Sequence, residues 1–217
     1  MRNFWLGFAA LAVVWGCASK PTEQVIISEG PRHPVTKKMS GVTDQLSAKD
    51  APSFSLKGTD GKTYSSADVL KSGPMVVISI KEGCPCSTDS QPLFNELSKR
   101  HQGKATFIGL YNEDIEKGKI WVEQKSVPYP VLIDHELKTI KDYAAERSVY
   151  VTLVDPEGKI VKVYPGYWKD MLVELDRKLG ELTQTKLDPF DPKYAPNTPS
   201  SGCQLYVGEG FSEGDVP

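Results

Sequence analysis

The feature that most constrains this fold is an apolar run that ends beside a pair of cysteines. Residues 74–80 read Pro-Met-Val-Val-Ile-Ser-Ile, a β-branched run typical of a strand buried on both faces. Gly83-Cys84-Pro85-Cys86 follows, and residues 88–100 carry apolar side chains at helical spacing. The pattern predicts a central strand that turns sharply into a helix, with both cysteines in the turn.

Further strands and helices alternate along the rest of the chain. The Asp-Gly pair at residues 60–61 predicts a tight hairpin turn before the central strand, because it supplies a positive φ. The expected strands are 106–110, 131–133, 150–154 and 160–164, and the expected helices are 116–125, 137–145 and 168–182. This order predicts an α/β sandwich around a mixed sheet.

The first residues are typical of a processing signal rather than of the fold. Arg2 precedes an uncharged apolar run, residues 4–15, which is too short to span a bilayer but suits a signal-peptide core. Gly16-Cys17 resembles the lipobox of bacterial lipoproteins, although Trp15 departs from the small residue usual there. We expect residues 1–17 to be a signal peptide and Cys17 to be lipidated, with ordinary cleavage or a retained anchor as the alternatives. A lipid anchor implies a bacterial cell-envelope location, facing the periplasm or the cell surface.

The remaining chain divides into three parts by composition. Residues 18–48 are polar and contain several prolines and glycines, which predicts a flexible tether. Residues 49–182 form the expected domain, and residues 183–217 form a proline-rich tail that carries Cys203. The 26 basic and 28 acidic side chains are dispersed, so the chain shows no electrostatic basis for binding nucleic acid.

Residues 51–182 resemble the alkyl hydroperoxide reductase and thiol-specific antioxidant (AhpC/TSA) superfamily, the peroxiredoxin-like redoxins. The resemblance rests on four blocks: Ala51–Leu56 with the 60–62 turn, Cys84–Ser87, Val127–Asp134 and Leu153–Lys159. It implies a thioredoxin-like three-layer sandwich with an N-terminal hairpin extension. The implied activity is thiol-disulfide exchange in cell redox homeostasis, with protein thiols or disulfides, or an external thiol reductant, as partners.

Cys84 is the expected nucleophile. Free N–H groups at a helix start stabilise a thiolate, and Pro85 is tolerated there. We expect Ser87 or Thr88 to cap the helix. Glu82 is expected to raise the pKa of Cys84 and so to oppose the helix terminus.

The partner of Cys84 remains open at this point. Ser87 stands where a Cys-x-x-Cys motif has its second cysteine, so Cys86 and Cys203 are the candidate resolving thiols. A permanent bridge from the turn to Cys203 is the structural alternative. Lys81, Ser87 and Arg147 are the expected supporting neighbours.

Peroxide reduction has weaker support than disulfide exchange. The family's peroxidatic threonine and proline positions hold Lys81 and Val77, and the position of its activating arginine holds Val149. Thioredoxins have a cis-proline at the position that Val149 occupies in this chain.

We expect no cofactor, with copper binding through Cys84 and Cys86 as the alternative, because two soft thiolates suit Cu(I). Arg147-Ser148-Val149-Tyr150 is similar to the His-Ser segment of Sco-type copper chaperones, but arginine replaces the ligand histidine. His101 and His135 are expected to be surface polar residues rather than ligands.

Overall fold

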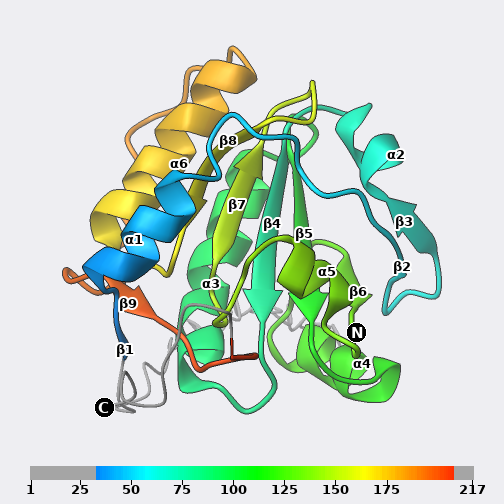
Figure 1. Ribbon diagram of the computed structural model, residues 1–217. Coiled ribbons are helices and arrows are strands. Elements are labelled where there is room, and N and C mark those ends of the chain that lie inside the picture. The colour runs from blue at the N-terminus through cyan, green and yellow to red at the C-terminus, as the bar shows by residue number, and fades with distance from the viewer. Residues whose placement is uncertain (1–32, 208–217) are drawn as a thin grey trace, which may run out of the picture.

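A computed structural model describes residues 33–207, which surround a five-stranded mixed sheet (Figure 1). The sheet order is β6-β5-β4-β7-β8; β4, β5 and β6 are parallel, and β7 and β8 each pair antiparallel with their neighbours. The strands are β4 (Met75–Ile80), β5 (Thr106–Tyr111), β6 (Val131–Ile133), β7 (Val151–Val154) and β8 (Ile160–Tyr164). The β-branched run forms the fully buried central strand β4, as its sequence predicted.

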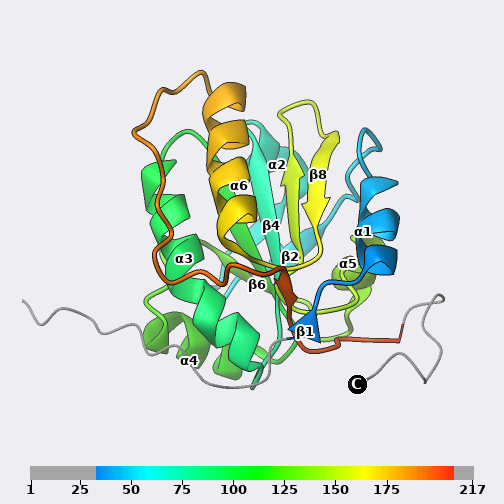
Figure 2. The same cartoon turned by 90° about the vertical axis from the view of Figure 1, so that its left-hand side faces the viewer.

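Helices cover both faces of this sheet (Figure 2). One face carries α3 (Pro85–Arg100), α4 (Ile115–Gln124) and α6 (Lys169–Leu182), and the other carries α1 (Lys37–Asp44), α2 (Ser66–Leu70) and α5 (Lys138–Asp142). Side chains along β4 alternate between the two cores: Val76 and Ile78 pack in the first, Met75 and Val77 in the second. The expected three-layer α/β sandwich is confirmed.

A two-stranded hairpin precedes the sheet strands. It consists of β2 (Ser55–Lys57) and β3 (Thr63–Ser65), which pair antiparallel. Gly61 has a φ of +84° in the connecting turn, a conformation that glycine adopts without steric cost. The predicted N-terminal hairpin is therefore confirmed.

Residues 33–48 differ from the flexible tether that their composition predicted. β1 (His33–Pro34) pairs with β9 (Ser200–Ser201), and α1 is capped by the hydroxyl of Thr36. Met39 and Thr43 are buried on the helix face that meets the domain. Two inward side chains one turn apart are enough to dock a short helix, a signal that proline and glycine counts do not capture. Residues 1–32, which include Cys17 and the signal segment, lie outside the described residues.

The tail after α6 is extended, as expected, but it packs along the domain. Arg100 donates a hydrogen bond to the Asp188 carbonyl, and its guanidinium lies 5.2 Å from the centre of the buried Phe190 ring. The chain then runs below the carboxyl end of β4 (Figure 1). Within residues 33–207, every helix is too short or too polar to cross a bilayer.

His101 is a correction to the sequence analysis. It is buried rather than on the surface, and its Nε2 lies 2.9 Å from the Asp176 carboxylate, which also accepts two hydrogen bonds from Arg100. The helix end that carries His101 is covered by α6, which only the tertiary packing reveals. His135 is exposed, as expected.

Candidate active site

The turn between β4 and α3 positions the two central cysteines. Cys84 is the N-cap residue of α3 and Pro85 occupies the first helical position. No side chain caps the helix, so the expected cap by Ser87 or Thr88 is wrong. Because the helix begins three residues earlier than predicted, Ser87 lies inside its first turn, where its hydroxyl accepts the Lys81 N–H at 3.2 Å. Ser87 thus holds the turn closed.

Several hydrogen-bond donors converge on the Cys84 sulfur, which is only 1% exposed. The Ser148 hydroxyl donates to it at 3.1 Å and the Cys203 backbone N–H at 3.2 Å. The side chains of Cys86 and Cys203 also act on it and lower its pKa. All three cysteines are free thiols. The structure therefore brings both candidate resolving thiols to the expected nucleophile.

These donors make the three thiols unequal. Hydrogen bonding from Cys86, followed by that from Ser148 and Cys203, lowers the pKa of Cys84 to about 4, although burial opposes the shift. The hydrogen bond to Cys84, together with burial, raises the pKa of Cys86. Burial, then the interaction with Cys84, raises the pKa of Cys203 to about 11. At neutral pH the site holds one thiolate and two protonated thiols, the arrangement that a disulfide-exchange nucleophile requires.

The loop before β7 presents Ser148 to this sulfur. Val149 is buried with a φ of +64°, a left-handed conformation that is strained for a β-branched residue. Its N–H donates to the Ser79 carbonyl at 2.7 Å, and the Ser79 hydroxyl donates to the Arg147 carbonyl at 2.9 Å. The central strand thus fixes the loop in the conformation that directs Ser148 at Cys84.

Sequence reasoning noted the Arg147–Tyr150 segment but gave Ser148 no role. Ser148 lies 64 residues from Cys84, and a single serine before a buried strand carries no signal of its own. Only the pairing of β4 with β7 brings them together.

Two of the three expected supporting residues, Lys81 and Arg147, contact the tail rather than the Cys84 sulfur. The Lys81 ammonium donates to the Gln204 carbonyl, and the Arg147 guanidinium donates to the Gly202 carbonyl at 3.2 Å. Both charges oppose the rise in the Cys203 pKa. Glu82 accepts a hydrogen bond from the Tyr111 hydroxyl, and it is not among the largest causes of the pKa shift of Cys84. The larger causes that act on the Cys84 pKa are therefore the neighbouring hydrogen-bond donors and burial, and the expected effect of Glu82 stays a prediction.

A cavity of about 460 Å³ opens beside the tail cysteine. Its lining is His33, Lys81, Arg147, Cys203, Gln204, Leu205, Tyr206 and Val207. Cys203 is half-buried and lines this cavity, whereas Cys84 is covered. A reagent that approaches from solvent therefore meets the Cys203 sulfur first.

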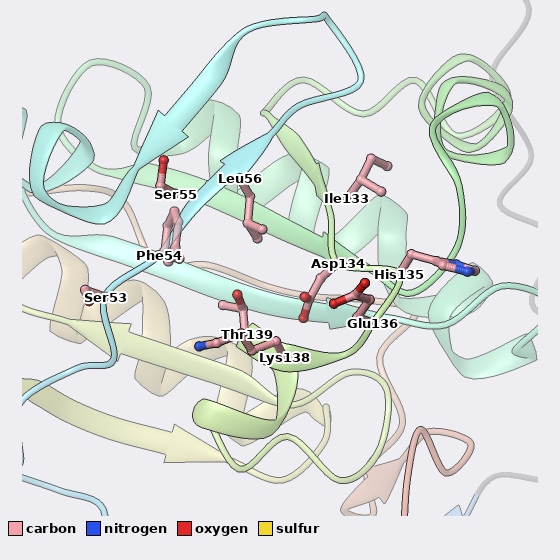
Figure 3. Close-up of a pocket in the computed structure, with 10 residues that line it drawn as sticks. All are labelled: Ser53, Phe54, Ser55, Leu56, Ile133, Asp134, His135, Glu136, Lys138 and Thr139. Atoms are coloured by element: carbon pink, nitrogen blue, oxygen red, sulfur yellow. The ribbon is translucent and has the colours of Figure 1, made fainter.

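A second cavity, of about 430 Å³, lies away from the cysteines between β2 and the turn from β6 to α5 (Figure 3). Phe54 and Leu56 line one side and Asp134 to Glu136 the other. The Asp134 carboxylate accepts the Ile140 N–H at 2.7 Å, so it serves helix α5. Across residues 33–207, no group of three or more His, Cys, Asp or Glu side chains is arranged to hold a metal ion.

Comparisons with known proteins agree with this arrangement of strands and helices. The AhpC/TSA family matches residues 48–163, more than half of the chain. The thiol-disulfide oxidoreductase ResA of Bacillus cereus is 26% identical over 150 residues, 68% of this chain and 78% of ResA.

Solved structures show the same fold. The thioredoxin domain of a thiol-disulfide oxidoreductase from Bacteroides vulgatus superposes with a TM-score of 0.54 at 21% identity, over 61% of this chain and 96% of that domain. The exposed lipoprotein thioredoxin Etrx1 of Streptococcus pneumoniae has a TM-score of 0.53 at 25% identity, over 60% of this chain and all of Etrx1 (100%). The thioredoxin-like fold is thereby confirmed.

Proposed function

The chain belongs to the AhpC/TSA family, and we propose that within it the protein is a thiol-disulfide oxidoreductase with Cys84 as nucleophile. The observation that carries this proposal is the Cys84 sulfur itself. The Ser148 hydroxyl and the Cys203 N–H donate hydrogen bonds to it, and the side chains of Cys86 and Cys203 also lower its pKa. The similarity to ResA of Bacillus cereus supports the same chemistry.

The first step uses the low pKa of Cys84. Its thiolate attacks one sulfur of a client disulfide, which forms a mixed disulfide and expels the other client sulfur as a thiolate. Cys84 then carries no negative charge, so one cause of the raised pKa of Cys203 disappears. Lys81 and Arg147 favour the charged form of Cys203 whenever the tail is seated beside them. The next nucleophile is thus activated by the first step.

We propose Cys203 as the resolving thiol. After losing its proton, it attacks the Cys84 sulfur, forms the Cys84–Cys203 disulfide and releases the client as a dithiol. An external dithiol then supplies two electrons to regenerate both thiols. Cys86 is less suited, because it is buried within the first turn of α3 and follows Cys84 across Pro85. An i,i+2 bridge there would be a small strained ring.

Disulfide mapping of the full chain tests this proposal most directly. After oxidation we expect a Cys84–Cys203 peptide pair, and in graded thiol buffers we expect it to reduce in the range of exchange enzymes, roughly −120 to −270 mV. The reduced protein should also turn over an insulin-like disulfide. A bridge that resists reduction below about −300 mV, with no turnover, contradicts an enzymatic role.

We propose that this chemistry needs no cofactor. The test is a Cu(I) titration of the fully reduced protein beside a Cys84→Ser, Cys86→Ser double variant. Tight uptake of one Cu(I) by the native chain, lost in the double variant, would favour a copper carrier instead.

We further propose a bacterial envelope location through a lipid on Cys17. The apolar run that ends at Gly16-Cys17 supports it, as does the similarity to an exposed lipoprotein thioredoxin. Mass spectrometry of the mature N-terminus is the test: an acylated Cys17 supports the anchor, and an unmodified or internal N-terminus contradicts it.

A further inference from the structure

The last described residues, Gly202–Val207, form an extended segment that covers the nucleophile. Resting on the proposed function, we propose that this segment is an intramolecular substrate mimic. A client polypeptide then binds in its place, as an extended strand on the main chain of residues 146–148, with its cysteine at the position of Cys203. The segment peels away to admit the client, and it returns after the mixed disulfide has formed, which brings Cys203 back to the Cys84 sulfur for resolution. Four observations support this inference. They are the main-chain pairing of the segment, the position of its sulfur, the lack of space for a side chain at Gly202, and the firm attachment of the residues just before it.

The main-chain pairing is that of an added antiparallel strand. The Gly202 N–H donates to the Ser148 carbonyl at 3.1 Å, and the Ser148 N–H donates to the Cys203 carbonyl at 2.9 Å. One step further, the Leu205 N–H donates to the Glu146 carbonyl at 2.8 Å, and Arg147 pairs with Gln204. Such strand addition takes its affinity from the main chain, so the bonds themselves do not depend on the side chains of the added strand.

The same pairing delivers a sulfur to the nucleophile. With Gly202 and Cys203 paired to Ser148, the Cys203 N–H lies 3.2 Å from the Cys84 sulfur and its thiol hydrogen-bonds to that sulfur. Ser148 pairs with the strand through its main chain and donates to Cys84 through its hydroxyl. The same residue therefore fixes the register of the strand relative to the Cys84 sulfur. A client cysteine in that register is presented for attack.

The segment also indicates which clients fit. A Cβ atom at Gly202 would lie 2.0 Å from the Ser148 hydroxyl oxygen and 2.5 Å from its carbonyl oxygen, so glycine is selected immediately before the cysteine. Lys81 and Arg147 bond to the carbonyls of Gln204 and Gly202, which every residue type offers. We therefore expect a preference for Gly-Cys in an extended chain, with little selection at the next residue.

The segment is attached so that its end can leave. Upstream, Ser200 exchanges main-chain bonds with Tyr167 at 2.7 and 3.3 Å, and Ser200 and Ser201 are buried. Residues 203–206 are only half-buried, and Val207 is 71% exposed. Peeling therefore starts at Gly202, while β9 stays paired with β1.

The test measures binding of a thiol-free peptide, so it does not depend on disulfide exchange. The peptide spans residues 198–207 with serine in place of Cys203, and its control carries an N-methyl group on the glycine, which removes the N–H that pairs with Ser148. The reduced full chain is compared with Gly202→Ala, whose added methyl group expels the segment, and with Gly41→Ala, where the methyl group meets open space.

We expect Gly202→Ala to bind the peptide at least about tenfold more tightly than the native chain, because the site no longer has to be vacated. Gly41→Ala should bind like the native chain, and the N-methyl peptide should lose about tenfold on Gly202→Ala. Equal binding by Gly202→Ala and the native chain, or equal binding of both peptides, overturns the proposal.

A second measurement applies if Gly202→Ala fails to fold. In the native chain, saturating peptide should speed hydrogen exchange at the Gly202 and Leu205 amides and leave Tyr167 unchanged. Unchanged exchange at Gly202 and Leu205 under saturation overturns the proposal. Peptide binding without turnover of client disulfides would refute the proposed function alone, and turnover without peptide competition would refute the docking alone.

Discussion

Cys86 reaches Cys84 through one turn of α3, whereas Cys203 reaches it from 119 residues away along the chain. The position of Cys86 is set by local geometry, so it cannot withdraw without unwinding the helix. Cys203 is held by a few hydrogen bonds on a half-buried segment and can leave while the fold persists. Under the proposed mechanism this comparison describes a division of labour: the helix turn sets the Cys84 thiolate, and Cys203 on the tail exchanges with it.

The largest expected effect comes from Cys84, the residue that both the helix turn and the tail contact. Cys84→Ser removes the nucleophile and should lower turnover of an insulin-like disulfide at least about 10³-fold. Far-ultraviolet circular dichroism controls for folding. Retained turnover in this variant would move the nucleophile to Cys86 or Cys203 and break the comparison.

Replacing each partner thiol separates the two segments. Cys203→Ser should lower turnover roughly 10- to 100-fold and accumulate a mixed disulfide between Cys84 and the client, because resolution stops. Cys86→Ser should still resolve. Mass spectrometry of quenched reactions measures the trapped species. Trapping in Cys86→Ser instead would assign resolution to the helix turn.

The next effect concerns pH. Cys86→Ala removes the strongest donor to the Cys84 thiolate, so the pKa of Cys84 should rise from about 4 by about two units. Thiolate absorbance in the ultraviolet, titrated against pH, measures the shift. An unchanged midpoint would show that the tail, not the turn, sets the thiolate.

The free energy of unfolding should depend on pH through the same group, the Cys84 thiol. The pKa of Cys84 is depressed in the folded state, so its stabilising contribution is fully present above the unfolded thiol pKa of about 8.5. That contribution is lost as the pH falls toward about 4. Cys86→Ala should flatten this dependence in denaturant titrations of the reduced protein. If the stability of Cys86→Ala depended on pH more steeply than that of the native chain, the prediction would be wrong.

Ser148→Ala should have a smaller effect, because it removes one neutral donor. We expect the pKa of Cys84 to rise by about one unit, which corresponds to about 1.4 kcal/mol. Ser148→Thr keeps the hydroxyl and should restore most of the shift. If the two variants titrate alike, the hydroxyl is not the source of the effect.

The smallest expected effect is that of Glu82→Gln. Its side chain is engaged with the Tyr111 hydroxyl, so the pKa of Cys84 should change by less than about 0.3 unit. A clear fall in that pKa would show that the Glu82 carboxylate raises the pKa of Cys84, as its place next to Gly83-Cys84 in the sequence predicts.

Features that depend on neighbouring residues were predictable from the sequence. The β-branched run predicted the central strand, and the Gly-Cys-Pro-Cys segment predicted a sharp turn into a helix, although the helix begins three residues earlier than expected. The role of Ser148 and the burial of His101 were not predictable, because each depends on residues more than 60 positions away. Residues 33–48 were misjudged for a related reason: their partners, β8 and β9, lie at the other end of the chain.

The cover over Cys84 has a consequence for how long the reduced protein survives. Thiolates that meet oxidants are oxidised to sulfenic acid and then irreversibly to sulfinic and sulfonic acids. Here the reactive thiolate is 1% exposed, and the sulfur facing solvent is the protonated, less reactive Cys203. The resting molecule thus keeps its most vulnerable atom under its own tail, and exposure to irreversible damage is confined to the moments when a client has lifted that tail.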